Sequence, residues 1–260
     1  MQKLLLSLKR WLRKQDQSDR IIPWTAEGVH EIVLGLANEV IPNNGILLDL
    51  GCGPGALTEK LFSKGYNVIA VDGFSEVFQL HDKVKFIELN LEEDWGSLGI
   101  NYDCIFAVEI IEHLENPYLF IRKCYSLLKP GGYLICTTPN AGHYISRIMF
   151  LTSGVFSLYS PKSFNSTTAT TLNRKLPPHK NLFTSWMLKG NLSEAGFMDM
   201  QFYPSTNFLT GLKPIPLRPL NLLKWVYFQM IGIVNLLIIH SSPDENIFSK
   251  NLIFHAKKPL

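Results

Sequence analysis

The sequence predicts an α/β fold in which a doubly wound, mainly parallel sheet carries helices on both faces. Runs of branched apolar residues alternate with amphipathic stretches up to about residue 140, which is typical of parallel βαβ units. A glycine-rich turn follows the first of these runs, at the place where doubly wound sheets bind ligands. Hydrophobic residues make up 46% of the 260 residues and charged residues 18%, which indicates a packed chain.

The predicted elements follow from hydrophobic periodicity and from the residues that cap or end them. The first helix is predicted over 27–40, where Val29, Val33 and Leu36 recur at helical spacing. Further helices are predicted at 57–64, 118–128 and 184–196, with a short one at 76–82, and "KPGG" (129–132) is expected to end the helix at 118–128. Seven strands are predicted at 46–50, 67–72, 84–89, 102–109, 133–139, 198–204 and 251–258.

The chain is predicted to be a single domain, 26–260, preceded by an N-terminal amphipathic helix at 1–25. Insertions at about 140–180 and 207–247 interrupt the alternation of strands and helices. The four cysteines include no C-x-x-C pair, so we interpret them as buried thiols in a reducing cytosol. The net charge of +3 gives no support for nucleic-acid binding across the whole chain.

Two apolar stretches raise the question of membrane contact. Residues 1–15 mix leucines with lysines and arginines, and this run is too short and too interrupted for a signal peptide or a span. It either packs on the protein itself or lies on an anionic membrane surface. Polar residues interrupt 219–240, which favours a buried or interfacial helix over a spanning one. We therefore expect a cytoplasmic protein, with a peripheral position at the inner face of the membrane as the alternative.

The stretch "ILLDLGCGPGAL" (46–57) does not by itself decide which cofactor its turn holds. Its glycines fit G-x-G-x-x-A, which can bind the pyrophosphate of a dinucleotide, and also D-x-G-x-G-x-G. Asp49 suits a cationic ligand better than a pyrophosphate, and Pro54 removes a backbone donor that a pyrophosphate could use. Asp72, at the end of the second strand, can accept both hydroxyls of an adenosine ribose in either case.

Three segments together resemble motifs of class I methyltransferases that depend on S-adenosylmethionine (SAM): "LLDLGCGPGALTEKLFSKGYNVIAVD" (47–72), "YDCIFAVEIIEHLENP" (102–117) and "LLKPGGYLICTTPN" (127–140). The resemblance covers about 26–140 and extends weakly to the last strands. It implies a Rossmann-like sheet of seven strands with an antiparallel last strand and SAM at the carboxyl ends. It also implies cofactor-binding residues: Asp49, Gly51, Cys52, Gly53 and Gly55 for the methionine end, Asp72 for the ribose, Asn90 and Leu91 for the adenine, and Glu109 near the transferred methyl.

The cluster "EIIEH" supplies the candidate catalytic residues Glu109, Glu112 and His113, which a helical turn would bring to one face. His113 is the preferred base for removing a hydroxyl proton, because an imidazole ordinarily titrates near neutral pH, and either glutamate could orient it. Similar E-x-x-E-H clusters occur in small-RNA 2′-O-methyltransferases and ubiquinone-pathway O-methyltransferases. The RNA branch adds a downstream histidine, here His179, to form a metal site. A divalent metal and a purely structural histidine remain alternatives, and we do not favour the metal.

The acceptor is expected to be a small molecule or a lipid-linked or sugar-bearing intermediate. The insertion at 140–180 combines aromatic and basic residues, and it loosely resembles bacterial methyltransferases of cell-envelope polysaccharide clusters. An RNA acceptor ranks lower, because the net charge is low and no RNA-binding domain is appended. Two other hypotheses are an NAD(P)-binding oxidoreductase and a non-catalytic partner protein with the same fold. The sequence sets no oligomeric state.

Overall fold

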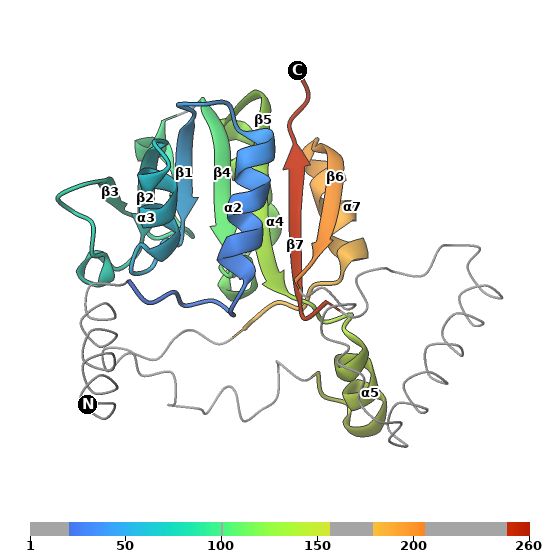
Figure 1. Cartoon of the computed structure of the whole chain (residues 1–260). Coiled ribbons are helices and arrows are strands. Elements are labelled where there is room, and N and C mark those ends of the chain that lie inside the picture. The colour runs from blue at the N-terminus through green and yellow to red at the C-terminus, as the bar shows by residue number, and fades with distance from the viewer. Residues whose placement is uncertain (1–20, 100, 157–178, 206–248) are drawn as a thin grey trace, which may run out of the picture.

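The computed structural model describes residues 21–99, 101–156, 179–205 and 249–260. They form a seven-stranded sheet in the order β3-β2-β1-β4-β5-β7-β6 (Figure 1). The strands are β1 (Ile46–Leu50), β2 (Asn67–Asp72), β3 (Lys85–Glu88), β4 (Tyr102–Val108), β5 (Leu128–Pro139), β6 (Met198–Pro204) and β7 (Asn251–Lys257). Strand β7 runs antiparallel to β5 and β6, and the strands from β3 to β5 pair in parallel. The doubly wound sheet and its antiparallel last strand are therefore confirmed.

Helices cover both faces of this sheet. They are α2 (Val29–Val40), α3 (Ala56–Ser63), α4 (Pro117–Leu127), α5 (Tyr144–Ser153) and α7 (Ser185–Ala195). Figure 1 shows α2 and α3 on the near face and α4 and α7 behind, while α5 lies beyond the carboxyl ends of the strands. Because both faces are covered, the central strands β1 and β4 are mainly apolar and buried, without alternation between the two faces.

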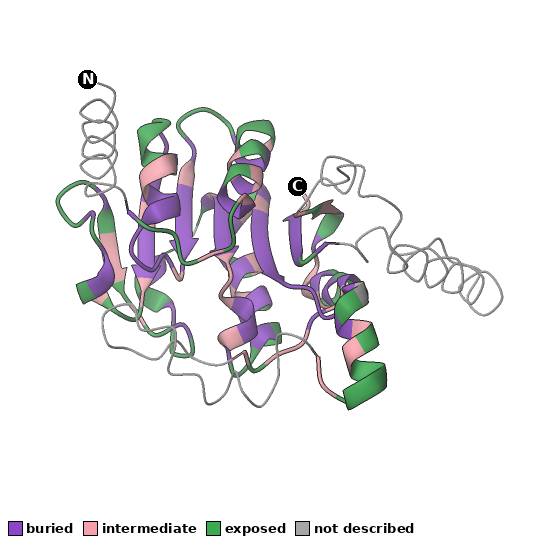
Figure 2. Ribbon diagram, turned by 60° about the horizontal axis from the view of Figure 1, so that its bottom comes forward, coloured by how far each residue is buried: buried purple, intermediate pink, exposed green. Residues whose placement is uncertain are grey.

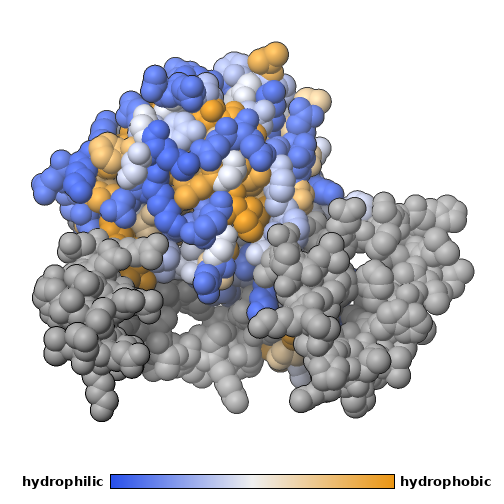
Figure 3. Space-filling model, viewed as in Figure 1, coloured by the Kyte–Doolittle hydropathy of each residue, from blue (hydrophilic) through white to orange (hydrophobic). Residues whose placement is uncertain are grey.

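Each face of the sheet has its own hydrophobic core. Phe120, Ile121 and Leu188 pack with the strands on the side of α4 and α7, and Val33 and Leu61 do so on the side of α2 and α3. Figure 2 shows buried strands between helices that are exposed only on their outer sides. The outer face of α2 and α3 is mainly hydrophilic, with smaller hydrophobic areas between the polar residues (Figure 3). Packing in these two cores fixes the positions of the strand ends, where the sequence motifs lie.

Two predicted helix boundaries and one predicted strand start are wrong. The helix expected at 76–82 is only a 3₁₀ turn, Ser75–Val77, because Phe78 returns to extended backbone and is buried. The helix before "KPGG" (129–132) ends at Leu127, within one residue of the prediction, but β5 begins at Leu128 rather than at 133, because Gly131 and Gly132 bond to Lys258 and Pro259 beyond β7. The first helix begins two residues late, because Gly28 adopts a left-handed conformation with φ of 87°.

Several predictions lie wholly or partly outside the described residues. Of the helix expected at 1–25 only residues 21–25 are described, and these are not helical. The insertion at 207–247 is not described. The stretches considered for membrane contact, 1–15 and 219–240, also lie outside. The first insertion is described to residue 156 and again from 179, and it contains α5. Among the helices that the structure describes, none combines the length and apolar character that a membrane span needs.

Candidate active site

The glycine loop joins β1 to α3 at the carboxyl edge of the sheet, which is the lower edge in Figure 1. Gly51, Gly53 and Gly55 adopt φ values of 72°, 52° and 94°, a region that disfavours residues with a side chain. A Cβ at Gly51 would lie 2.8 Å from Ile110 Cγ1, and a Cβ at Gly55 would lie 2.9 Å from Phe78 Cε2. The glycines therefore permit the turn and let side chains from two other segments pack directly against it.

Backbone donors in this loop are largely satisfied within the protein. The N–H groups of Gly51 and Cys52 donate to the Val71 carbonyl oxygen at 2.8 and 3.1 Å. The N–H of Gly53 donates to the Asp72 carboxylate at 2.9 Å, and the proline that follows has no N–H. A pyrophosphate site needs several N–H groups aimed at the ligand, so this geometry does not suit a dinucleotide.

Two carboxylates place negative charge beside the loop. Asp49 is 2% exposed and accepts a 2.6 Å hydrogen bond from Thr58 Oγ1. Burial raises the pKa of the Asp49 carboxyl to about 6, and burial also raises the pKa of Asp72. Burial, followed by the charges of Asp49 and Asp72, raises the pKa of the Cys52 thiol, so both carboxylates act on the loop. Their combined field favours a cationic ligand.

Cys52 lies in the loop, but its side chain packs into the hydrophobic core beside α2 and α3. Its backbone N–H is already bonded to the Val71 carbonyl oxygen. A cofactor on this loop would therefore contact neither the thiol nor the backbone N–H of Cys52. The packing and the hydrogen bond of this residue help to fix the shape of the loop.

The turn after β3 contains the two residues predicted to meet the adenine. Asn90 Oδ1 accepts the N–H of Glu92 at 3.2 Å, and its Nδ2 donates to Glu93 at 3.1 Å. A carbonyl oxygen has two lone pairs, so Asn90 can accept a second hydrogen bond there. Leu91 is buried in the core. Glu92 also accepts the N–H of Glu115, which ties this turn to the segment after β4.

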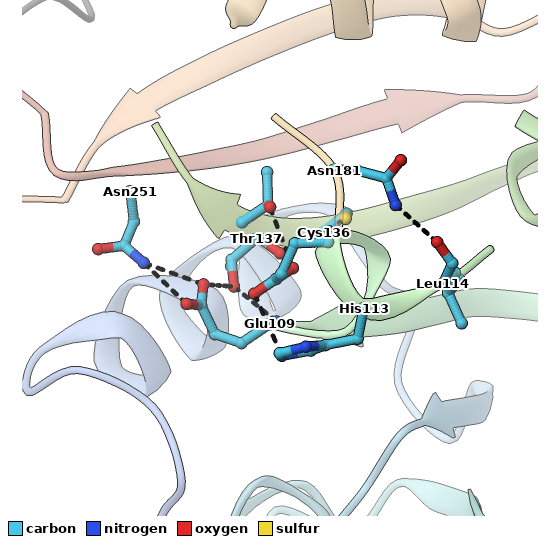
Figure 4. Close-up of polar contacts among 9 residues, drawn as sticks. Glu109, His113, Leu114, Cys136, Thr137, Asn181 and Asn251 are labelled. Carbon is cyan, nitrogen blue, oxygen red and sulfur yellow. Dashed lines mark hydrogen bonds and ion pairs between the residues drawn. The ribbon is translucent and has the colours of Figure 1, made fainter. Parts of the chain in front are cut away.

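Glu109 follows β4 directly and is held by two neighbouring strands. Thr137 Oγ1 on β5 donates to its carboxylate at 2.7 Å, and Asn251 Nδ2 on β7 donates to both oxygens at 3.0 Å (Figure 4). Burial raises the pKa of this carboxyl. The backbone of Glu109 has φ of 54°, a conformation that costs on the order of 1–3 kcal/mol for a residue other than glycine. The surrounding bonds fix this carboxylate in a strained position.

Glu112 and His113 form the 3₁₀ turn Ile111–His113. Glu112 is fully buried and accepts a 3.0 Å hydrogen bond from Thr138 Oγ1. Its other oxygen receives no hydrogen bond from the described residues and lies 3.9 Å from His113 Nε2. Burial, and then the charge of Glu109, raises the pKa of Glu112 well above its usual range. The His113 side chain is 17% exposed, so a substrate can reach it, whereas Glu112 is out of reach.

His179 joins this cluster from the far end of the first insertion. Its ring centroid lies 4.9 Å from that of His113, and the two rings are T-shaped. One ligand atom from each of Glu112, His113 and His179 can be chosen so that all lie within 4.8 Å of one another. This set of one carboxylate and two imidazoles suits a divalent cation of the zinc or manganese type. Glu109 is not part of it, because its carboxylate faces Thr137 and Asn251.

Residues 179–181, which we call the clamp segment, bind the backbone of the E-x-x-E-H turn. The N–H groups of Lys180 and Asn181 donate to the Glu112 carbonyl oxygen at 2.7 and 3.0 Å. Asn181 Nδ2 donates to the Leu114 carbonyl oxygen at 2.6 Å (Figure 4), and Lys180 pairs with Glu115. The clamp segment therefore fixes the position of the turn that carries His113.

Sequence reasoning missed several residues of this site. Thr137, Thr138 and Asn251 hold the two glutamates, and the order of β5 and β7 in the sheet brings them there. Asn181 holds the turn from the clamp segment. His143 directly follows β5 and its turn, where a histidine could be a second candidate base or an exposed loop residue, and the structure shows that it is not exposed. It is 7% exposed and caps α5 by accepting the Ile145 N–H, and burial lowers its pKa to about 4.

Residues 24–199 match a family model described as a methyltransferase domain, and this range is more than half of the 260 residues. The chain belongs to the class I SAM-dependent methyltransferases. SAM is its methyl donor, and the chain is an enzyme, as the three sequence motifs predicted. The alternative of an NAD(P)-binding oxidoreductase is therefore set aside, in agreement with the satisfied amides of the loop.

Among curated proteins, this methyltransferase is similar to ubiquinone biosynthesis O-methyltransferases. It is 34% identical to the mitochondrial enzyme of Rattus norvegicus over 117 residues, which are 40% of this chain and 34% of that protein. It is 32% identical to the enzyme of Aliivibrio fischeri over 134 residues, which are 45% of this chain and 57% of that protein. The similarity therefore spans between about a third and just over half of these relatives.

Solved structures show the same fold. A SAM-dependent methyltransferase from Archaeoglobus fulgidus matches with a TM-score of 0.56 and 22% identity, covering 88% of this chain and 94% of that one. Phosphoethanolamine N-methyltransferase 2 of Haemonchus contortus, solved in complex with SAM, matches with a TM-score of 0.52 and 16% identity, covering 88% of this chain and 53% of that one. At these identities the likeness concerns the architecture of the methyltransferase.

Proposed function

We propose that this methyltransferase acts on a hydroxyl group of a small or lipid-linked acceptor, with His113 as the base. The observation that carries the proposal is the contact between Gly51 and Ile110, which joins the glycine loop to the turn bearing His113. A methyl donor on the loop and an acceptor beside His113 would then be neighbours. The similarity of part of this chain to ubiquinone biosynthesis O-methyltransferases supports oxygen as the methylated atom.

The proposed cofactor placement uses the two carboxylates beside the loop. The methionine end of SAM lies along 51–55, where the charge of Asp49 favours its amino group and sulfonium. Asp72 accepts the ribose hydroxyls, and Asn90 and the Leu91 backbone meet the adenine. The Gly53–Asp72 hydrogen bond holds the loop against β2, so the ribose side of the site is preorganised before the cofactor arrives.

The reaction is an in-line displacement on the sulfonium methyl. The acceptor oxygen attacks the methyl carbon, the carbon–sulfur bond breaks, and its electron pair stays on the sulfur of the neutral thioether product. His113 takes the hydroxyl proton and passes it to solvent, which its partial exposure allows. Glu112, 3.9 Å from His113 Nε2, lies beside the ring and helps to orient it. The clamp segment fixes the turn that carries His113, and the resulting alignment of base and acceptor supplies the remaining rate acceleration.

His113→Gln tests the base directly. We expect methyl transfer to fall by about 10²–10⁴-fold while binding of S-adenosylhomocysteine stays within about twofold, because the base touches only the acceptor proton. The readout is transfer of label from methyl-labelled SAM into cell extract, separated into organic and aqueous fractions. Hydriodic acid should release the label as methyl iodide, as expected of an O-methyl group. Label that resists this treatment, or a variant with undiminished transfer, would contradict the proposal.

A metal-assisted form of the same reaction is the second candidate, and the set formed by Glu112, His113 and His179 favours it. The Glu112 oxygen without a hydrogen bond from described residues fits a ligand role. A divalent cation there would lower the pKa of an acceptor hydroxyl. In that case His179→Gln would abolish activity and bound metal together, as measured by elemental analysis. If His113 acts only as a base, His179→Gln should keep most of the activity, and chelation by EDTA should have no effect.

A further inference from the structure

Trp24, in the segment before α2, contacts the middle of the glycine loop. A Cβ on Gly53 would lie 3.3 Å from Trp24 Cε3, 3.7 Å from Cζ3 and 3.8 Å from Cδ2. All three atoms belong to the six-membered ring of the indole. The residue is 36% exposed, so the ring is partly open to whatever occupies the space beside it. Nothing in the catalytic account above uses this residue.

The negative charges around this contact suit a cation, and an aromatic ring there can add to the attraction. The loop is flanked by Asp49 and Asp72, whose charges favour a cationic ligand. A sulfonium ion has no N–H to donate, so carboxylates can attract it but cannot hydrogen-bond to it. The face of an indole attracts such a cation electrostatically and, unlike a third carboxylate, adds no charge that would have to be buried.

We propose that Trp24 is a cofactor-binding residue whose indole packs against the methionine end of SAM and recognises its positive sulfonium. The inference rests on the cofactor placement proposed above. Trp24 and the glycine loop would bound the sulfonium from two sides and exclude water from the reacting carbon. Since the product S-adenosylhomocysteine has a neutral thioether, the same ring would hold the product less tightly than the substrate.

The alternative is that Trp24 only packs against the loop. Packing area would serve SAM and S-adenosylhomocysteine alike, because the two differ by one methyl group and the sulfur charge. An attraction to the cation would serve SAM alone. The ratio of the two dissociation constants therefore separates the two roles, and Trp24→Leu is the sharpest variant because it keeps an apolar side chain and removes the aromatic ring.

The experiment is calorimetric titration of the full chain and of Trp24→Leu and Trp24→Phe with SAM and with S-adenosylhomocysteine. Trp24→Leu should weaken SAM by about 3- to 30-fold and S-adenosylhomocysteine by no more than about twofold. Trp24→Phe should fall between Trp24→Leu and the native protein. Trp186→Leu is the matched control, because Trp186 is 65% exposed on α7, and it should change neither constant.

An equal loss for both ligands in Trp24→Leu, or no loss for either, would overturn the role of Trp24. A second measurement does not depend on how well the leucine variant folds. SAM should change the tryptophan fluorescence of the native protein, and most of that change should disappear in Trp24→Phe. A full response in Trp24→Phe would also overturn the inference. A native protein that binds neither ligand would instead refute the underlying cofactor placement.

Discussion

At the scale of single residues, Asp49 is a buried carboxyl whose charged form is unfavourable in the cofactor-free protein. The carboxyl is buried with one hydroxyl as its hydrogen-bond partner, and burial raises its pKa to about 6. An acid whose folded pKa exceeds its unfolded value of 3.8 makes the cofactor-free protein less stable as pH rises between those two values. In the proposed SAM site a bound cation would offset this cost, so the destabilising carboxylate would contribute to ligand affinity.

The pH dependence of binding should report this residue. Affinity for S-adenosylhomocysteine, whose amino group is cationic, should fall about tenfold from pH 7 to pH 5, because Asp49 is then mostly protonated. Asp49→Asn should bind weakly at pH 7 and show a much flatter profile in the same calorimetric titrations. Binding is the better readout than stability, because burial lowers the pKa of His30 and His143 to about 4 and gives stability the opposite slope. An unchanged profile in Asp49→Asn would contradict this role.

Asn251 should have a measurable effect on the Glu109 carboxylate. Asn251→Asp replaces two donated hydrogen bonds by a like charge beside a buried carboxyl, so we expect a loss of about 2–4 kcal/mol in the free energy of unfolding near pH 8. Near pH 5 the loss should be smaller, because one carboxyl of the pair is then protonated. Urea unfolding measures both values, and Asn38→Asp on the exposed side of α2 is the control. Equal losses at both pH values would argue against the charge explanation.

The sequence was informative about residues only where a motif is local. Asp49, Asp72 and the loop glycines sit within one βαβ unit, so their spacing alone indicated their meeting place. Thr137 and Asn251 come from β5 and β7, and nothing near them in the chain indicates that both bind Glu109. The hydrogen bond that Asp72 accepts from the Gly53 N–H could not be predicted either, because it depends on how the loop turns back over β2.

At the scale of elements, strands were predicted better than the segments between them. The runs at 46–50 and 67–72 are strands with those bounds, because buried strands appear in the sequence as short apolar runs between turn residues. The edge strand at 198–204 also has the predicted bounds, although none of its residues is buried. The start of β5 was predicted too late, because the glycines and proline of "KPGG" usually lie between elements. Here they lie in β5 and bond to the chain beyond β7. The clamp segment could not be foreseen, since its partners are backbone carbonyl oxygens of another turn.

The clamp segment should affect turnover more than cofactor affinity. Asn181→Leu removes the donor to the Leu114 carbonyl oxygen and loosens the turn that carries His113. We expect kcat to fall about 10- to 100-fold with S-adenosylhomocysteine affinity unchanged, because a misplaced base slows proton transfer without altering the glycine loop. Asn181→Asp lacks the same donor and should not restore turnover, whereas Asn181→Gln should restore part of it. A parallel loss of affinity and kcat would contradict a positioning role.

At the scale of the whole molecule, the sheet gathers segments that are far apart in sequence at one edge. The ends of β1, β2 and β4 bring the glycine loop, Asp72 and the E-x-x-E-H turn together, and the clamp segment joins them from the far end of the first insertion. The architecture and the methyl donor could be predicted from sequence because the three motifs resemble those of class I methyltransferases in their residues, order and spacing. The acceptor could not, because the fold carries many acceptor classes and its pocket depends on loops rather than on the sheet.

The central claim is that the loop at 51–55 and Asp72 form a SAM site at this edge. Calorimetric titration of the native chain and of Asp72→Asn with S-adenosylhomocysteine and with NAD tests it most directly. The account predicts binding of S-adenosylhomocysteine but not NAD, and a loss of about 10- to 100-fold in Asp72→Asn, since hydrogen bonds to a charged group are lost. Asp103→Asn, the same change at the opposite edge where Asp103 pairs with Lys129, should bind normally. Tight binding of NAD, or undiminished affinity in Asp72→Asn, would contradict the account.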